Sequence, residues 1–196
     1  KLGIVQFFSW FAFFTMWSFA TPALTEHVFN AADPASAEYQ EAANLVSSYM
    51  GTYGLSSMAF ALLLTFIAGK VRINRKFVHM GSLIIGGLGF IYMYFVKDHV
   101  MLQVSFACIG IAWGSILSMP YAMLSGSIDA KKMGLFMGLF NMFIVIPQIV
   151  AALGGVNWAY KTLLGEATIN TMVLAGISLI LAGLCNLLIT EKEAIK

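Results

Sequence analysis

Six long apolar runs dominate this sequence and restrict the folds that are open to it. Each has about 18 residues or more, the length that an α-helix needs to cross a bilayer core roughly 30 Å thick. The runs cover approximately residues 2–29, 45–68, 77–96, 100–124, 135–159 and 169–189. In lipid the backbone must satisfy its own hydrogen bonds, and a β-barrel would show short alternating segments instead. The sequence therefore predicts an all-α integral membrane protein, a six-helix bundle in which residues 1–196 form one unit.

The composition excludes several classes of protein. Of the 196 residues, 60% are hydrophobic and only 10% are charged, and the mean hydropathy is +0.84. Because soluble domains have about 25% charged residues, a soluble enzyme and a nucleic-acid binder are both disfavoured. Cys108 and Cys185 lie inside apolar runs without ligand spacing, so we expect neither a disulfide framework nor a metal site. We expect no cofactor and, without an HExxH, GxSxG or phosphate-loop motif, no catalytic residue.

The basic residues predict the orientation in the membrane. If the six runs simply alternate, nine of the eleven Lys and Arg residues fall on one side. These nine are Lys1, Lys70, Arg72, Arg75, Lys76, Lys131, Lys132, Lys192 and Lys196. By the positive-inside rule both termini of this segment are cytoplasmic. The chain has no N-x-[ST] acceptor and its cytoplasmic loops are short, which suits a bacterial inner membrane.

The opposite side carries a polar loop over residues 26–44, where we expect a short helix at 35–43. The six runs also divide into two sets of three, and the second set starts on the side opposite to the first. This arrangement is typical of the inverted repeats inside one half of a transporter.

The fifth run has small and polar residues along one helical face. They follow an alternating spacing of four and three: Gly134, Gly138, Asn141, Val145, Gln148, Ala152 and Gly155. Amides at membrane depth need partners, which are either a polar ligand or a neighbouring helix. Pro147 frees a backbone carbonyl one turn earlier, so we expect the helix to bend there.

Aromatic residues mark the first, second and fourth runs. Trp10, Phe13 and Trp17 share a face of the first run with Gln6, and Tyr53 lies in the second. The fourth contains Trp113 and Gly114, and Pro120 interrupts its hydrogen-bond ladder. Aromatic rings suit the apolar face of a sugar and amides bind its hydroxyls. The alternative for the tryptophans is core packing or contact with lipid.

Several motifs together resemble a known family. Residues 110–155 contain Gly114, Pro120-Tyr121, Lys132-x-Gly134, Gly138, Asn141 and Pro147-Gln148, and the opening FFSWFAFFTMW and the loop KVRINRK match as well. This pattern resembles sugar transporters of the major facilitator superfamily, of the sucrose/maltose or glycoside–pentoside–hexuronide type. The resemblance covers nearly the whole chain as the C-terminal six of twelve helices, and a first residue of Lys1 rather than Met agrees with a longer chain.

The resemblance implies a rocker-switch carrier with a central sugar cavity between two halves. Two positions depart from the family pattern. Thr21-Pro22 stands where many sucrose-transporting relatives have Thr-Asp, and the basic loop has Val71 and Ile73 near the position of an acidic residue. A proton-coupling acid is therefore expected in the N-terminal half.

These observations lead to one hypothesis: a secondary transporter of a disaccharide or other glycoside, coupled to a proton or another cation. The predicted substrate-binding residues are Trp10, Trp17, Tyr53, Trp113, Asn141 and Gln148, and the predicted gating or helix-bending residues are Gly114, Pro120, Gly138 and Pro147. The predicted partners are the sugar, the coupling ion, the lipid bilayer and the N-terminal six-helix half. The alternative is a self-contained six-helix channel or assembly subunit.

Overall fold

The computed structural model describes residues 1–190, which contain helices and no strand. The long elements are α1 (Leu2–Phe29), α2 (Ala37–Ala68), α3 (Arg75–Tyr92), α4 (Leu102–Ser125), α5 (Met133–Val150), α6 (Val156–Leu163) and α7 (Asn170–Cys185). Six spans within the described part are long and apolar enough to cross a membrane, and α5 and α6 together make one of them. The predicted all-α membrane bundle is confirmed. Lys192 and Lys196, which entered the charge argument, lie outside the described residues.

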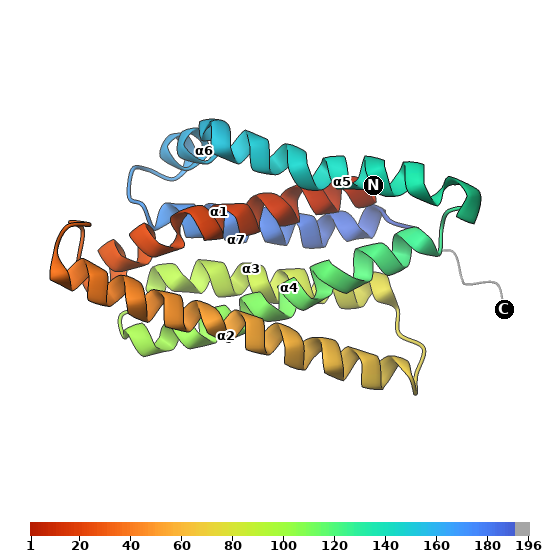
Figure 1. Cartoon of the computed structure of the whole chain (residues 1–196), viewed down its shortest axis with the longest axis horizontal. Coiled ribbons are helices and arrows are strands. Elements are labelled where there is room, and N and C mark those ends of the chain that lie inside the picture. The colour runs from red at the N-terminus through yellow and green to blue at the C-terminus, as the bar shows by residue number, and fades with distance from the viewer. Residues whose placement is uncertain (191–196) are drawn as a thin grey trace.

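Four helices form the core and two lie at its edges. Helix α3 packs between α4 and α7, and α1 packs against α7. Helix α2 packs on α4, whereas α5 packs on α1, so these two helices lie on opposite sides of the bundle (Figure 1). The largest fully buried side chains, such as Phe13, Phe90 and Phe106, come from α1, α3 and α4. Helices α2 and α5 consequently leave much apolar surface uncovered.

Glycines set the distance between α3 and α7. A Cβ atom on Gly87 would lie 2.8 Å from the carbonyl oxygen of Gly176, and one on Gly176 would lie 2.7 Å from the carbonyl oxygen of Gly87. Both distances are too short for real carbon–oxygen contacts. Only glycine therefore permits this close approach, which is how helices without a hydrophobic driving force between them gain packing energy in lipid.

Helix α2 is longer than the sequence predicts. It begins at Ala37 rather than near Leu45, so the short helix expected at 35–43 is the first part of the membrane helix. Ser36 provides the start, because its side chain accepts a hydrogen bond from the backbone N–H of Tyr39 at 3.1 Å. At 32 residues, α2 is longer than the roughly 20 needed to cross the bilayer core, and the additional turns carry polar residues such as Glu38 and Glu41.

The fifth span also differs from the continuous helix that the sequence predicts. Its α-helix α5 ends at Val150, a π-helical segment, η4 (Ala151–Gly155), follows, and α6 then begins. Gly154 in this segment has a φ of 96°, a left-handed conformation that favours glycine. The chain then remains helical to Leu163, beyond the expected end near residue 159.

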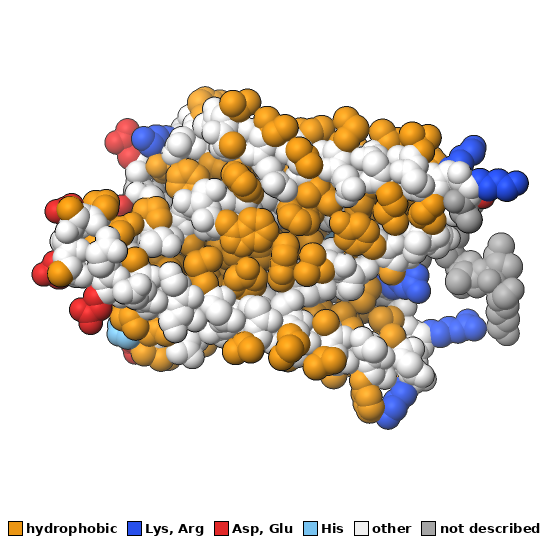
Figure 2. All heavy atoms as spheres, viewed as in Figure 1, with side chains coloured by type: hydrophobic (Ala, Val, Ile, Leu, Met, Phe, Trp, Pro, Cys, Tyr) orange, Lys and Arg blue, Asp and Glu red, His pale blue; other side chains and the backbone are white. Residues whose placement is uncertain are grey.

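Charged side chains gather at the two ends of the molecule. Figure 2 shows most Lys and Arg side chains at one end and most Asp and Glu side chains at the other, with a broad apolar band between them. This distribution is the one expected of a protein whose middle lies in hydrocarbon and whose ends lie in water.

Candidate functional site

The centre of the candidate site is a cluster of aromatic rings from two helices. Trp10 and Trp17 lie on α1, and Trp113 packs against both of them from α4. The ring centroid of Trp113 is 5.6 Å from that of Trp10 and 5.4 Å from that of Trp17, both in edge-to-face arrangements. Trp10 and Trp17 are 6.2 Å apart. The fold thus brings together three predicted site residues from distant parts of the sequence.

Phe13 forms the base of this tryptophan cluster. Its ring is fully buried and lies 4.8 Å from Trp113 and 6.0 Å from Phe90 on α3. Trp17, in contrast, is 40% exposed. The cluster is therefore anchored in the core at one side and open at the other, so that it presents aromatic surface on a rigid support.

Gln6 lies one helical turn before Trp10 on the same face of α1. It is fully buried, and neither polar atom of its amide has a hydrogen-bond partner among the described residues. The indole Nε1 of Trp10 is also buried without a partner there. The spacing of the first apolar run placed Gln6 on the tryptophan face, but nothing in that spacing showed that its amide would be unpaired.

Tyr53 reaches the core from α2. Its side chain is partly buried against the main hydrophobic cluster, and its backbone carbonyl faces Gly110 of α4 at close range. Ser56, one turn further on, donates a hydrogen bond of 2.7 Å to the carbonyl of Ala107. A Cβ atom on Gly114 would lie 3.0 Å from the carbonyl of Ser57, so Gly114 lies in the tight contact between α2 and α4.

Helix α5 has one buried face and, beside it, one exposed face. Phe140, Ile144 and Pro147 of α5 are buried, as is Ala151 of η4, and the four recur at the same four-three spacing as the polar stripe beside them. Asn141 is exposed and Gln148 is partly buried. Neither amide makes a hydrogen bond to another of residues 1–190, so both are free to bind a group that this part of the chain does not supply.

The predicted bending positions lie in different surroundings. Helix α4 runs unbroken through Pro120, and α5 runs through Pro147 before it changes to the π-helical segment four residues later. Gly138 has no atom within 4 Å of the place that a Cβ would take, so that side of α5 is open.

Histidines link the helices in ways that the sequence did not indicate. At the acidic end, His99 Nδ1 lies 2.7 Å from the Tyr49 hydroxyl, and its ring stacks on Phe29 at 5.2 Å. His79 near the basic end is fully buried, and its Nδ1 lies 2.8 Å from Ser115 Oγ. His79 therefore lies inside the protein, because α4 packs over it.

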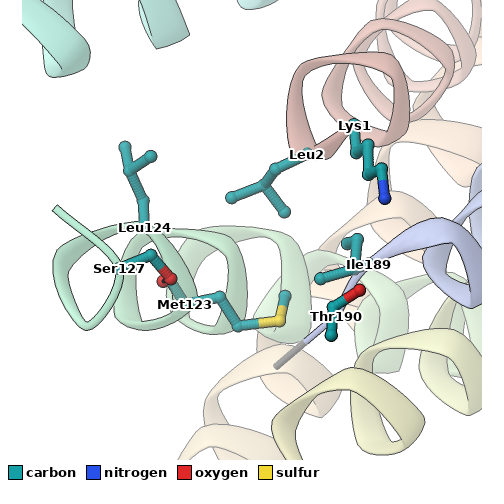
Figure 3. Close-up of a pocket in the computed structure, with 7 residues that line it drawn as sticks. All are labelled: Lys1, Leu2, Met123, Leu124, Ser127, Ile189 and Thr190. Atoms are coloured by element: carbon teal, nitrogen blue, oxygen red, sulfur yellow. Dashed lines mark hydrogen bonds between the residues drawn. The ribbon is translucent and has the colours of Figure 1, made fainter. Parts of the chain in front are cut away.

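Two hollows that open to the surface lie elsewhere. A cavity of about 250 Å³ at the basic end is lined by Lys1, Leu2, Met123, Leu124, Ser127, Ile189 and Thr190 (Figure 3). A second, of about 200 Å³, lies beside Glu26 and His27. Neither hollow is lined by a predicted substrate-binding residue, and the tryptophan cluster is open to the surface through Trp17. Within the described part, no three His, Cys, Asp or Glu residues lie close enough to hold a metal ion.

A comparison with protein families agrees with this architecture. The family model described as Major Facilitator Superfamily matches residues 2–152. The match includes α1 to α5 and therefore all six predicted substrate-binding residues.

Proposed function

Since the chain belongs to the Major Facilitator Superfamily, a family of membrane transporters, we propose that it is the C-terminal half of a sugar carrier. The substrate would be a disaccharide or another glycoside. The observation that carries this proposal is the cluster of Trp10, Trp17 and Trp113 on an open face of α1 and α4.

The chemistry of sugars supports this assignment. A pyranose ring presents C–H groups on its faces and hydroxyls around its edge. The face of an indole attracts the C–H groups, and an amide can both donate to and accept from hydroxyls. Asn141 and Gln148 on α5 have unpaired amides that can serve this second role, and Tyr53 adds a hydroxyl from α2.

The partner in this proposal is an N-terminal six-helix half. Helices α2 and α5 carry long rows of exposed apolar residues, among them Leu55, Leu62, Leu135 and Leu139. A second bundle covering these rows would enclose the tryptophan cluster. The two halves would then rock about the bound sugar and expose it to each side of the membrane in turn.

The proposed setting is a bacterial inner membrane with the basic end of the molecule in the cytoplasm. The positive-inside rule supports this orientation. The coupling ion, a proton or another cation, would bind mainly in the N-terminal half, because each membrane span of the described chain lacks a mid-depth carboxylate.

Uptake of a panel of radiolabelled sugars tests the proposal. We would measure uptake into membrane vesicles that contain the full-length carrier, with and without a pH gradient. Wild-type carrier should accumulate a glucoside or disaccharide. N141A and Q148A should each lower uptake by about tenfold, the loss expected for one hydrogen bond of about 1.4 kcal/mol.

N157A is the matched control, since Asn157 is an exposed amide on α6 away from the cluster. Wild-type rates in both N141A and Q148A would remove these residues from the site. A full-length gene product with only six spans would instead favour the self-contained channel or assembly subunit.

A further inference from the structure

Four cations lie where α2 is joined to α3: Lys70 and Arg72 in the basic loop, and Arg75 and Lys76 in the first turn of α3. The two in α3 bind carbonyls of neighbouring segments. Arg75 Nη1 donates to the carbonyl of Ala122 near the end of α4 at 3.2 Å. Lys76 Nζ donates to the carbonyls of Leu187 and Ile189, which follow α7, at 3.1 and 2.7 Å. The C-terminal end of a helix carries a partial negative charge and attracts cations, so these two side chains have a structural role.

Lys70 and Arg72 have no such partners. Both side chains are exposed, and neither forms a hydrogen bond or an ion pair within residues 1–190. Lys70 Nζ lies 3.9 Å over the ring of Phe66, which holds the ammonium beside an apolar surface. Asp129 is the single acid of residues 1–190 in the loops at this end, and its carboxylate already accepts from the backbone N–H of Lys131.

Exposed apolar residues accompany these two charges. Phe66 is 61% exposed, Val71 is 62% exposed and Phe77 is 52% exposed. The loop between them is held in place by Ile73, which packs against the small core of Leu64, Met119 and Met123. Cations and apolar groups thus alternate on this anchored loop, at the end of the molecule where Figure 2 shows most of the Lys and Arg side chains.

We propose that Lys70 and Arg72 bind the headgroups of anionic phospholipids, while Phe66, Val71 and Phe77 lie in the acyl layer beneath them. A guanidinium matches a phosphate in a bidentate fashion and an ammonium binds it as a point charge. Basic groups beside a membrane span attract anionic lipid in this way, and their stems and apolar neighbours remain in the hydrocarbon. The proposal requires only that the chain spans a bilayer, and is independent of the transported substrate.

Lipid selectivity of the full-length carrier in nanodiscs tests this proposal. Electron spin resonance with spin-labelled phosphatidylglycerol and phosphatidylcholine gives the relative association constant of the two lipids. Wild-type protein should prefer phosphatidylglycerol, and the preference should decrease with salt. The double variant K70Q/R72Q should lower it several-fold, with an upper limit of about fivefold for each charge, the factor that corresponds to about 1 kcal/mol.

K97Q/K161Q is the matched control, because it removes two exposed cations from the opposite end of the molecule. It should leave the preference unchanged. K70Q/R72Q should keep the wild-type thermal unfolding midpoint, since neither side chain holds another part of the fold.

Three results would overturn the proposal. One is a wild-type protein without preference for the anionic lipid. Another is an equal loss in K97Q/K161Q, which would assign the effect to net charge. The third is chemical cross-linking of Lys70 to an acidic residue of the N-terminal half, which would assign the loop to a contact within the protein.

Discussion

The ring of Trp113 on α4 lies 4.8 Å from the ring of Phe13 on α1, with an angle of 38° between their planes. This contact joins an exposed aromatic surface to the buried core, because Phe13 also touches Phe90. Trp113 therefore connects the tryptophans of α1 both to α4 and, through Phe13, to the core.

Replacing Trp113 tests the role of the cluster in transport. W113A in the full-length carrier should lower sugar uptake in vesicles by tenfold or more, because it removes the ring that packs against both Trp10 and Trp17. An aromatic pair of this kind contributes about 0.5–1.5 kcal/mol, and W113F should therefore retain part of the activity. W158A is the control, since Trp158 on α6 is exposed and outside the cluster. Equal uptake by W113A and W158A would contradict the assignment.

Gln6 should be a destabilising residue. Its amide is buried without a partner, and such a group costs about 1–3 kcal/mol. Q6L keeps a similar volume without the polar atoms and should raise the thermal unfolding midpoint of the full-length carrier in detergent. Q103L is the control, because Gln103 is exposed and its substitution should leave the midpoint nearly unchanged. A lower midpoint in Q6L would show that the amide has a partner in the complete protein.

Any side chain at Gly87 should destabilise the protein. G87A places a Cβ atom 2.6 Å from Ile180 and 2.8 Å from the carbonyl of Gly176, so α3 and α7 must separate. We expect a loss of about 1–3 kcal/mol in the free energy of unfolding, the range for overpacked cores. G51A on α2 meets nothing within 4 Å and should be neutral or slightly stabilising. Chemical unfolding in mixed micelles compares the two variants, and an unchanged G87A would argue against this helix contact.

The hydroxyl of Tyr49 should stabilise the acidic end. Y49F removes its hydrogen bond to His99 and should lower the free energy of unfolding by about 1 kcal/mol. Y94F is a close control, since Tyr94 contacts His27 through its backbone carbonyl at 2.8 Å and through ring stacking, neither of which needs the hydroxyl. Chemical unfolding of the two variants in mixed micelles should give a lower free energy of unfolding for Y49F than for Y94F. Equal free energies of unfolding would exclude the Tyr49–His99 hydrogen bond.

The membrane spans and the separation of charge could be predicted from the sequence, because both depend on local composition. An apolar run long enough to cross a bilayer is recognisable whatever it packs against. The boundaries were less predictable: α2 starts at Ala37 because Ser36 caps it, and the polar residues that follow had indicated a loop.

The arrangement of the site could not be predicted from the sequence in the same way. The spacing of Trp10 and Trp17 placed both on one face of α1, but not beside Trp113. The four-three spacing on α5 fits its polar stripe and its buried stripe equally well, and the burial of Phe140 and Ile144 distinguished them. Likewise, only the packing of α4 against α3 shows that His79 is buried beside Ser115.

The sequence by itself determined that this chain is helical, spans a membrane six times and has a basic and an acidic end. Only the tertiary structure decided which helix faces meet, that Gly87 and Gly176 allow α3 to approach α7, and that three tryptophans form one surface. The physical reason is that transfer of a helix into lipid depends on its own residues. The rotation and depth at which helices pack depend instead on the shapes of both partners.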